Sequence, residues 1–398
     1  MRLLLIILVT ATTLYTTLLA QWERCNVPNN TAISCFALSG TTIYAGTSGA
    51  LLQSTNSGTS WNRININSQS MRAVAIDIYE NRITVAAQGI LESAVITSTD
   101  NGSSWTVINT GLTNSEVNSL ARMGVTLFAG TPAGVFLTTN NGVNWVQANS
   151  GLTDTAVAAL AVMGTTVVAA TSSGNIFLST NNGTKWMQTA HPATTSFNCM
   201  AVSGTNLYVG THGDGLFVST NIGTSWSAIS TGLGDKKVLT LYADAPNLFA
   251  GTYGTGVVRS TNNGTSWEEI NTGLLDLRVR AVIVHNQYLF AGSSFGIWRR
   301  KTSEVLSSAE SSSTAITTTW CFPNPATEII TITTPPSLEN STGTIRYSVV
   351  NVQGEEVMHI DSDNKNVPVS TSVLPNGMYT IVATCGIQRA ATTLLILR

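Results

Sequence analysis

One short motif occurs six times in the chain at nearly constant spacing. It reads Ser/Thr-Thr-Asn/Asp-x-Gly-x-x-Trp, and its tryptophans at positions 61, 105, 145, 186, 226 and 267 are 44, 40, 41, 40 and 41 residues apart. Its Asn or Asp, Gly and Trp are Asn56, Gly58, Trp61, Asp100, Gly102, Trp105, Asn140, Gly142, Trp145, Asn181, Gly183, Trp186, Asn221, Gly223, Trp226, Asn262, Gly264 and Trp267. A period near forty, with strand-like residues around a glycine turn, is typical of a β-propeller blade.

The residue types of this turn motif predict a self-supporting bend. An Asn or Asp side chain accepts hydrogen bonds from backbone N–H groups one or two residues on. The Gly supplies a positive φ, and the Trp begins the next strand with its ring placed to pack between blades. The side-chain oxygens would also suit a calcium site. Because five of the six copies carry neutral Asn, we interpret the motif as structural and predict no metal and no cofactor.

A second recurring motif, which we call the Ala-Gly phrase, predicts how the propeller ring closes. A strand ending in Ala-Gly or a variant occurs seven times, and the seventh unit ends near Lys301 without a turn motif. Residues 21–26 match the strands that follow the motifs, and Trp22 precedes Trp61 by 39 residues. We therefore expect an all-β fold with a seven-bladed propeller over residues 21–301, closed by the N-terminal strand so that no sheet edge stays open. Six or eight blades are the alternatives.

The turn motif resembles the Asp-box of the BNR repeat family, found in sialidases, in the sortilin propeller and in photosystem-assembly-factor-like propellers. The resemblance covers all six copies in order. It implies that each motif lies on the hairpin between the third and fourth strands of a blade, remote from the central binding face. The resemblance therefore implies a fold rather than an activity.

The N-terminus has the pattern of a secretory signal peptide. Met1-Arg2 is followed by an apolar run from Leu3 to Ala20, and cleavage is expected after Ala20, which makes residues 1–20 the signal peptide. An uncleaved membrane anchor is the alternative, since the run could nearly span a bilayer. After cleavage no integral membrane segment is expected.

Composition and cysteine usage fit an extracellular protein. Charged residues make up only 10% and the net charge is −2, which offers no basic face for nucleic acid. The five cysteines are Cys25, Cys35, Cys199, Cys321 and Cys385. Bridges between Cys25 and Cys35 and between Cys321 and Cys385 are one interpretation, and buried free thiols are the other.

Beyond the propeller, the sequence predicts a linker and a second domain. Residues 302–319 are rich in Ser and Thr and are typical of a flexible linker. Residues 320–398 alternate short strands with Asn-Gly and Gln-Gly turns, which favours a small immunoglobulin-like β-sandwich. The phrases Pro323-Asn324-Pro325-Ala326 and Leu374-Pro375-Asn376-Gly377-Met378-Tyr379 make this segment similar to the C-terminal sorting domain of the type IX secretion system. An ordinary accessory module is the alternative.

That second resemblance implies a location and a partner. The type IX secretion machinery would be the partner, and the product would pass through the periplasm to become secreted or attached to the outer cell surface. We expect a monomer whose ligand, if any, is an extracellular glycan or protein.

No catalytic constellation is evident in the propeller segment. The Arg-Ile-Pro signature of sialidases is missing, and no nucleophile elbow, His pair or phosphate loop occurs. We predict a non-catalytic binding scaffold, with a sialidase-like glycoside hydrolase as the alternative. Two carboxylates about 5 to 10 Å apart on the central face, or an arginine cluster there, would favour the hydrolase.

The candidate binding surface lies opposite the turn motifs, where loops follow the Ala-Gly strands. Its informative side chains are His212, Asp214, Asp235, Lys236, Tyr253 and Phe295. Aromatic rings beside a few polar groups would suit a sugar or a peptide.

Overall fold

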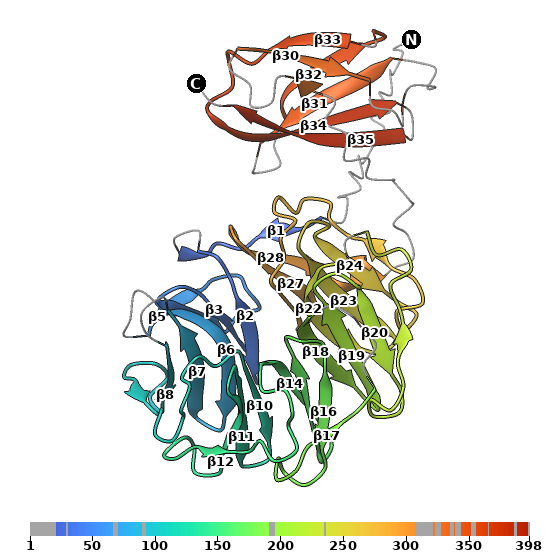
Figure 1. Ribbon diagram of the computed structural model, residues 1–398. Coiled ribbons are helices and arrows are strands. Elements are labelled where there is room, and N and C mark those ends of the chain that lie inside the picture. The colour runs from blue at the N-terminus through green and yellow to red at the C-terminus, as the bar shows by residue number, and fades with distance from the viewer. Residues whose placement is uncertain are drawn as a thin grey trace, which may run out of the picture. The chain divides into compact units, whose positions relative to one another are not determined.

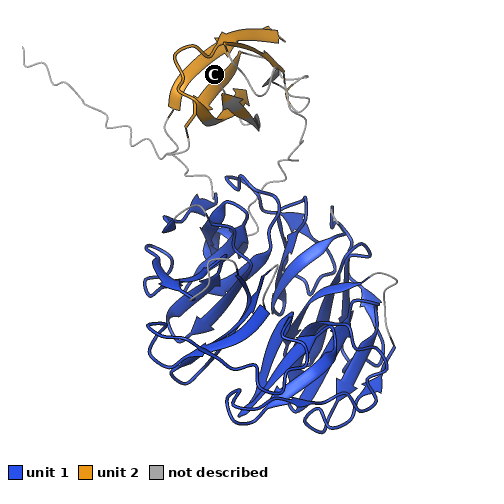
Figure 2. Ribbon diagram, turned by 60° about the vertical axis from the view of Figure 1, so that its left-hand side comes forward, with its two compact units in different colours: residues 1–306 blue, residues 307–398 orange. Residues whose placement is uncertain are grey.

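The computed structural model describes residues 21–28, 31–66, 71–89, 93–190, 196–234, 236–306, 321–322, 328–334, 338, 344–351, 356–364, 366–385 and 388–396. The expected signal peptide and Asp235 lie outside these residues. The chain divides into two compact units, residues 1–306 and 307–398, which are described separately (Figure 2).

The first unit is a β-propeller of seven four-stranded antiparallel sheets (Figure 1). Blades 1 to 6 each contain four consecutive strands, and blade 7 takes one strand from the N-terminus. Blade 1 contains β2 (Cys35–Ser39), β3 (Thr42–Gly46), β4 (Ala50–Ser54) and β5 (Asn62–Asn65). Blade 2 contains β6 (Arg72–Tyr79), β7 (Arg82–Gln88), β8 (Ser93–Ser98) and β9 (Thr106–Val107). Blade 3 contains β10 (Ser119–Met123), β11 (Thr126–Thr131), β12 (Gly134–Thr138) and β13 (Val146–Gln147).

The remaining blades continue in chain order around the ring. Blade 4 contains β14 (Val157–Met163), β15 (Thr166–Thr171), β16 (Ile176–Ser179) and β17 (Met187–Gln188). Blade 5 contains β18 (Phe197–Ser203), β19 (Asn206–Thr211), β20 (Leu216–Ser219) and β21 (Ser227–Ala228). Blade 6 contains β22 (Val238–Asp244), β23 (Asn247–Thr252), β24 (Val257–Ser260) and β25 (Glu268–Glu269). Blade 7 contains β26 (Ala281–His285), β27 (Tyr288–Ser293), β28 (Gly296–Lys301) and β1 (Glu23–Arg24).

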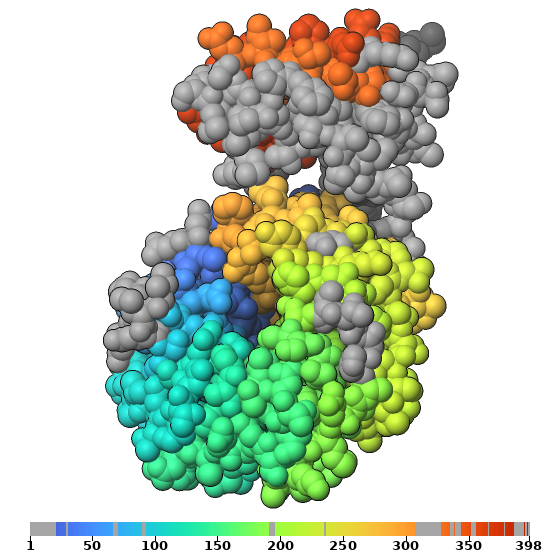
Figure 3. Space-filling view, viewed as in Figure 1, coloured from blue at the N-terminus to red at the C-terminus, as the bar shows by residue number. Residues whose placement is uncertain are grey.

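The first strand of each blade lies innermost, and these inner strands approach one another around a central hollow (Figures 1 and 3). The second strands are almost wholly buried, because neighbouring blades cover both of their faces, and this explains their continuous apolar runs. Small residues are needed where the blades meet. A Cβ on Gly46 would lie 2.5 Å from Cys35 Sγ and 2.7 Å from Ala73 O.

The N-terminal strand closes the ring, as the sequence predicted. In β1, Glu23 pairs with Arg299 and Arg24 with Trp298, both in β28. The side chain of Arg299 also contacts Glu23 at 3.4 Å and donates to Ser57 O in blade 1 at 2.9 Å. Strand β1 therefore completes blade 7, and Arg299 of that blade links it to blade 1.

The six turn motifs share one hydrogen-bond pattern, and its bonds join residues further apart in the sequence than we predicted. In the first copy the Ser54 hydroxyl accepts from the Gly58 N–H at 2.9 Å, and Asn56 Oδ1 accepts from the Ser60 N–H, four residues on, at 2.9 Å. A positive φ also occurs twice, at Gly58 and at the preceding Ser57. The expectation of a bond one or two residues on was wrong, because two consecutive left-handed residues curl the chain back further.

The motif tryptophans tie neighbouring blades together. Trp105, Trp145, Trp186, Trp226 and Trp267 each donate the indole N–H to a carbonyl in the blade before. Trp61 instead donates to Gly58 O of its own turn and packs edge-on against Phe290. These contacts place the rings between blades.

The segment after β28 differs from the predicted linker. Residues 302–306 form a short helix, α1 (Thr302–Leu306), and Val305 is fully buried with Trp22 and Ile270. In the other blades the turn motif fills the equivalent position, as when Gly264 packs against Ile229. Helix α1 thus occupies the place of the missing seventh motif, and the rest of the predicted linker, residues 307–319, lies outside the described residues.

Of the two interpretations of Cys25 and Cys35, the structure shows free thiols and not a bridge. Cys25 and Cys35 both carry free thiols, and burial raises the pKa of each to about 12. The other suggested pair includes Cys321, whose side chain lies outside the described residues, so that pairing stays a prediction.

The second unit is a small immunoglobulin-like β-sandwich. One sheet contains β29 (Cys321–Phe322), β30 (Ile329–Thr333) and β33 (Asn366–Ser370). The other contains β31 (Ile345–Val350), β32 (Glu356–Ser362), β34 (Gly377–Cys385) and β35 (Gln388–Ile396). Alternating residues such as Ile330, Tyr347 and Ile381 fill its core. Among the described residues of the chain, no helix is long and apolar enough to cross a membrane.

Candidate ligand-binding face

A repeated position at the start of the inner strands defines one face of the propeller, which we call the inner-strand face. Near the start of each inner strand stands one fully buried residue: Ile33, Ala73, Val117, Val157, Phe197, Val238 and Val279. The residue before it is at least partly exposed in every blade: Ala32, Arg72, Glu116, Ala156, Ser196, Lys237 and Arg278. Cations therefore occupy this position in blades 2, 6 and 7, and an acid occupies it in blade 3.

Tyr253 is held between two of these cations. It follows β23 in blade 6, and its N–H donates to Lys237 O at 3.0 Å. Lys237 Nζ lies 4.3 Å and Arg278 Cζ 4.5 Å from the centre of its ring. Such cation–π contacts hold the cationic groups in place beside a ring that is still 43% exposed.

Asp276 connects this site to the neighbouring loop of blade 7. Its Oδ1 accepts from the Arg278 N–H at 3.0 Å, and its Oδ2 accepts from the Ser294 N–H at 2.8 Å. The next residue, Phe295, is 58% exposed, although large apolar rings are normally buried. The carboxylate therefore holds the backbone of Arg278 and the backbone of the loop that carries the exposed Phe295 side by side.

Arg280, two residues after Arg278, carries a buried polar atom without a partner. Its Nε has no hydrogen-bond acceptor among the described residues. The pKa of the Arg280 guanidinium is lowered, and burial is the largest cause. The positive charges of Arg278 and Arg72 lower this pKa further, whereas the negative charge of Asp276 raises it. The local field is therefore positive, and one donor remains to be satisfied.

The structure places the described sequence-predicted residues on this same face. His212 is exposed after β19, and its N–H donates to Ser196 O at 2.9 Å. The Asp214 N–H donates to Thr211 Oγ1 at 2.8 Å. The backbone carbonyl of Lys236, whose side chain is exposed, accepts from the Gly215 N–H at 3.0 Å. These three residues lie where blades 5 and 6 meet. Tyr253 lies at the junction of blades 6 and 7.

Sequence reasoning missed Arg72, Lys237, Asp276, Arg278 and Arg280. Arg72 begins β6 and Lys237 directly precedes β22, and Arg278 and Arg280 lie on either side of the buried Val279. Aligning the seven units on their buried residue would have brought the cations to one equivalent position. The loop residues were found because they follow the recognisable Ala-Gly phrase.

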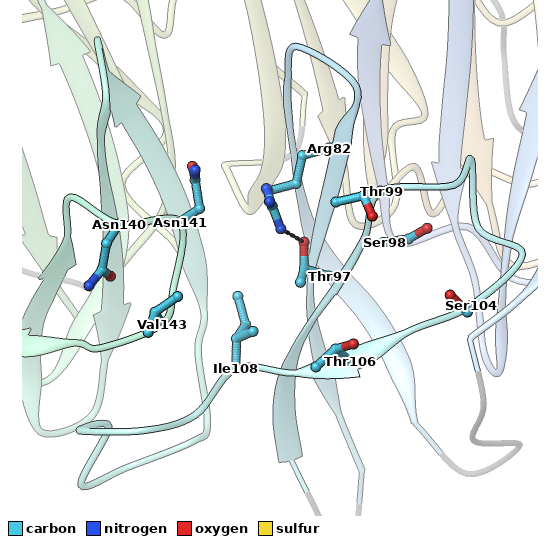
Figure 4. Close-up of a pocket in the computed structure, with 10 residues that line it drawn as sticks. All are labelled: Arg82, Thr97, Ser98, Thr99, Ser104, Thr106, Ile108, Asn140, Asn141 and Val143. Atoms are coloured by element: carbon cyan, nitrogen blue, oxygen red, sulfur yellow. Dashed lines mark hydrogen bonds between the residues drawn. The ribbon is translucent and has the colours of Figure 1, made fainter.

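A shallow groove on the turn-motif side lies between blades 2 and 3. Its volume is about 470 Å³, and Figure 4 shows Arg82 pointing toward Thr97, to which it donates at 3.3 Å. The lining residues are Arg82, Thr97, Ser98, Thr99, Ser104, Thr106, Ile108, Asn140, Asn141 and Val143. Since Arg82 is the one charged group among them, the groove offers no acid–base pair. No cluster of three or more His, Cys, Asp or Glu side chains suited to a metal occurs within the described part of the chain.

The fold and this face define a seven-bladed β-propeller with a cationic and aromatic surface at the start of its inner strands, followed by a β-sandwich. The sandwich belongs to a known family, since residues 321–397 match the model of the secretion system C-terminal sorting domain. No curated protein sequence matches the chain.

Solved structures with the same fold include both a binding protein and enzymes. YCF48 bound to D1 peptide is 16% identical, covers 70% of this chain and 94% of its own, and has a TM-score of 0.56. YCF48 from Cyanidioschyzon merolae is 15% identical over 71% and 98%, also with a TM-score of 0.56. The GH74 xyloglucanase from Xanthomonas campestris is 15% identical, with a TM-score of 0.58, over 72% of this chain and 54% of the enzyme. At these identities the likeness concerns the fold alone.

Proposed function

We propose that this protein is an exported propeller that binds an extracellular ligand on its inner-strand face without chemically changing it. The observation that carries the proposal is the presence of two exposed aromatic rings on one face: Tyr253, whose ring lies against Lys237 and Arg278, and Phe295, whose loop is held by Asp276. Rigidly held rings and charges lose little entropy on binding. The sorting domain implies export by the type IX machinery, which would deliver the monomer to the cell surface or medium through the periplasm.

The ligand class expected from this surface is a glycan or a protein segment. An exposed ring offers an apolar face, and the neighbouring cations and backbone groups give orientation. The fold supports such a role, because YCF48 uses the same architecture and its structure contains a bound peptide.

A glycan array with site variants tests the binding role. The Phe295→Ser variant should lose most of the signal of any bound glycan. The control is Val143→Ser, because Val143 is similarly exposed, at 65%, but lies in a turn motif of blade 3. Equal binding by wild type and by Phe295→Ser would contradict the proposed face, and loss of binding in Val143→Ser alone would move the site to the turn-motif side.

A glycoside hydrolase is the second candidate, and the arginines favour it. Arg72, Arg278 and Arg280 form the kind of cluster that would suit this alternative, and GH74 enzymes share the fold. However, the carboxylate of Asp276 is committed to two backbone N–H groups. Release of reducing ends from a bound glycan, abolished in Asp276→Asn, would establish hydrolysis, whereas binding without release supports the scaffold.

A further inference from the structure

The inner-strand face carries more positive charge on one side than on the other. Arg72, Lys237 and Arg278 hold the same structural position in blades 2, 6 and 7, and Arg280 lies two residues after Arg278, directly before β26. Blade 3, the neighbour of blade 2, has Glu116 at this position, and blades 1, 4 and 5 have the uncharged residues Ala32, Ala156 and Ser196. The face is thus electrically polarised although the whole chain has a net charge of −2.

The strand pairing brings these cations to the loops of the preceding blades. Val279 donates to Thr252 O, which sets Arg278 beside Tyr253, and Arg72 forms a backbone bridge with Ser48 of blade 1. The charges of Arg72 and Arg278 both act on Arg280, although Arg72 belongs to a blade on the far side of blade 1. Since blade 1 lies between blades 7 and 2 and has Ala32 at this position, the cations follow an arc over blades 6, 7, 1 and 2 that is interrupted at blade 1.

Holding several like charges together is costly unless an anion offsets them. The Nε atom of Arg280 is buried and has no partner within the described residues. An unpaired buried donor costs free energy that an anionic oxygen would recover. Two observations thus point to an anionic ligand: cations repeat at one structural position in three blades, and the Arg280 Nε donor is unsatisfied.

We propose that this cationic arc binds an acidic polysaccharide, with uronate carboxylates or sulfate esters on Arg278 and Arg280 and a sugar ring against Phe295. This inference rests on the proposed binding function and names its ligand class. A chain with repeated charges fits an arc better than a single small anion does. Both negative group types offer the same oxyanion chemistry to a guanidinium.

The aromatic residues favour a polysaccharide over an acidic polypeptide. The ring of Tyr253 is engaged with Lys237 and Arg278, so it holds the cations in position. Phe295, 58% exposed, presents an apolar surface on the loop that Asp276 joins to the backbone of Arg278. A charged sugar unit combines a flat C–H face with its anionic group, whereas Asp and Glu side chains carry theirs on flexible stems.

Binding to four polymers tests the ligand class directly. The purified full-length protein is titrated with polygalacturonate, heparin, dextran and poly-L-glutamate at low and at high salt. We expect binding to polygalacturonate, to heparin or to both, weakened by salt, and none to dextran. Binding to polygalacturonate alone identifies uronate as the source of the anion, and binding to heparin alone identifies sulfate. Tighter binding to poly-L-glutamate than to both glycans would overturn the proposal.

Charge-removing variants locate the site. Arg278→Gln and Arg280→Gln should each weaken acidic-glycan binding at least about tenfold, the expected effect of one charge-assisted hydrogen bond. Lys185→Gln removes one exposed charge from a turn motif in blade 4 and should leave affinity unchanged. Thermal melting checks folding, and the exposed Arg278 provides a test that does not depend on the partly buried Arg280.

The same variants distinguish a wrong ligand class from a wrong binding face. If neither arginine variant changes the affinity, the cationic arc is not the anion site and the inference is overturned. If Phe295→Ser then still abolishes binding to a neutral glycan, the inner-strand face remains a binding face and only its ligand class was wrong.

Discussion

The indole N–H of Trp22 donates to the carbonyl of Ile270, a residue 248 positions further along the chain. Trp22 stands in front of the closing strand β1, and Ile270 follows the last strand of blade 6. The bond reproduces between blades 6 and 7 the contact that motif tryptophans make elsewhere in the ring. The N-terminus therefore supplies the outer strand and also the interblade tryptophan.

Removing this tryptophan should destabilise the ring. Trp22 is 3% exposed, so Trp22→Ala should lower the free energy of unfolding by about 3–5 kcal/mol through a cavity and a lost hydrogen bond. Trp22→Phe should cost less, since it keeps most of the apolar contact. Urea denaturation followed by fluorescence measures both, and an unchanged midpoint in Trp22→Ala would show that closure contributes nothing.

Helix α1 should behave as part of the propeller. Val305 is fully buried, so Val305→Ala should cost about 2 kcal/mol from lost apolar burial and the resulting cavity. Leu306→Ala is the control, because Leu306 is 39% exposed in the same helix. Equal melting temperatures for the two variants would mean that α1 does not substitute for a seventh turn motif.

The fifth turn motif contains a strained backbone position, which a substitution should relieve. Ile222 has a φ of +57° where four of the other copies have Asn and one has Ser, and β-branched residues disfavour this left-handed region. Ile222→Asn should stabilise the protein by about 1 kcal/mol. The reverse exchange, Asn263→Ile at φ +58°, should destabilise it by a similar amount. Stabilities that move in the same direction in both variants would refute this explanation.

The second motif should be sensitive to acid. Hydrogen bonds from Ser104 and Ser98 lower the pKa of Asp100 to about 2, from an ordinary value of 3.8. Because the folded-state pKa is depressed, the stabilisation is fully present above the unfolded pKa and is lost as the pH falls from 3.8 to about 2. Asp100→Asn should remove this part of the acid dependence. Superimposable unfolding curves against pH for wild type and variant would contradict it.

The fold was predictable because its information is repeated. Six motifs, seven Ala-Gly phrases and the match between residues 21–26 and the post-motif strands specify blade number and closure together. Helix α1 was missed because Thr302–Leu306 is too short to show a helical period. Its role depends on the vacancy left by the absent motif, which is visible only once the blades are packed.

The binding face was predictable only where loops are marked by local sequence. Tyr253 and Phe295 follow the Ala-Gly strands and could be named in advance. Arg278 and Arg280 are separated from Arg72 by most of the chain, and only the closed ring lets their charges act on one another. Whether the named residues bind a ligand stays a prediction.

Hydrogen–deuterium exchange with and without a saturating acidic glycan tests the central claim most directly. Binding on the inner-strand face should slow exchange in residues 236–238, 252–256, 276–281 and 294–296, and should leave the six turn motifs unchanged. Protection confined to the turn motifs, or a glycan that binds while these four segments exchange as before, would contradict the account.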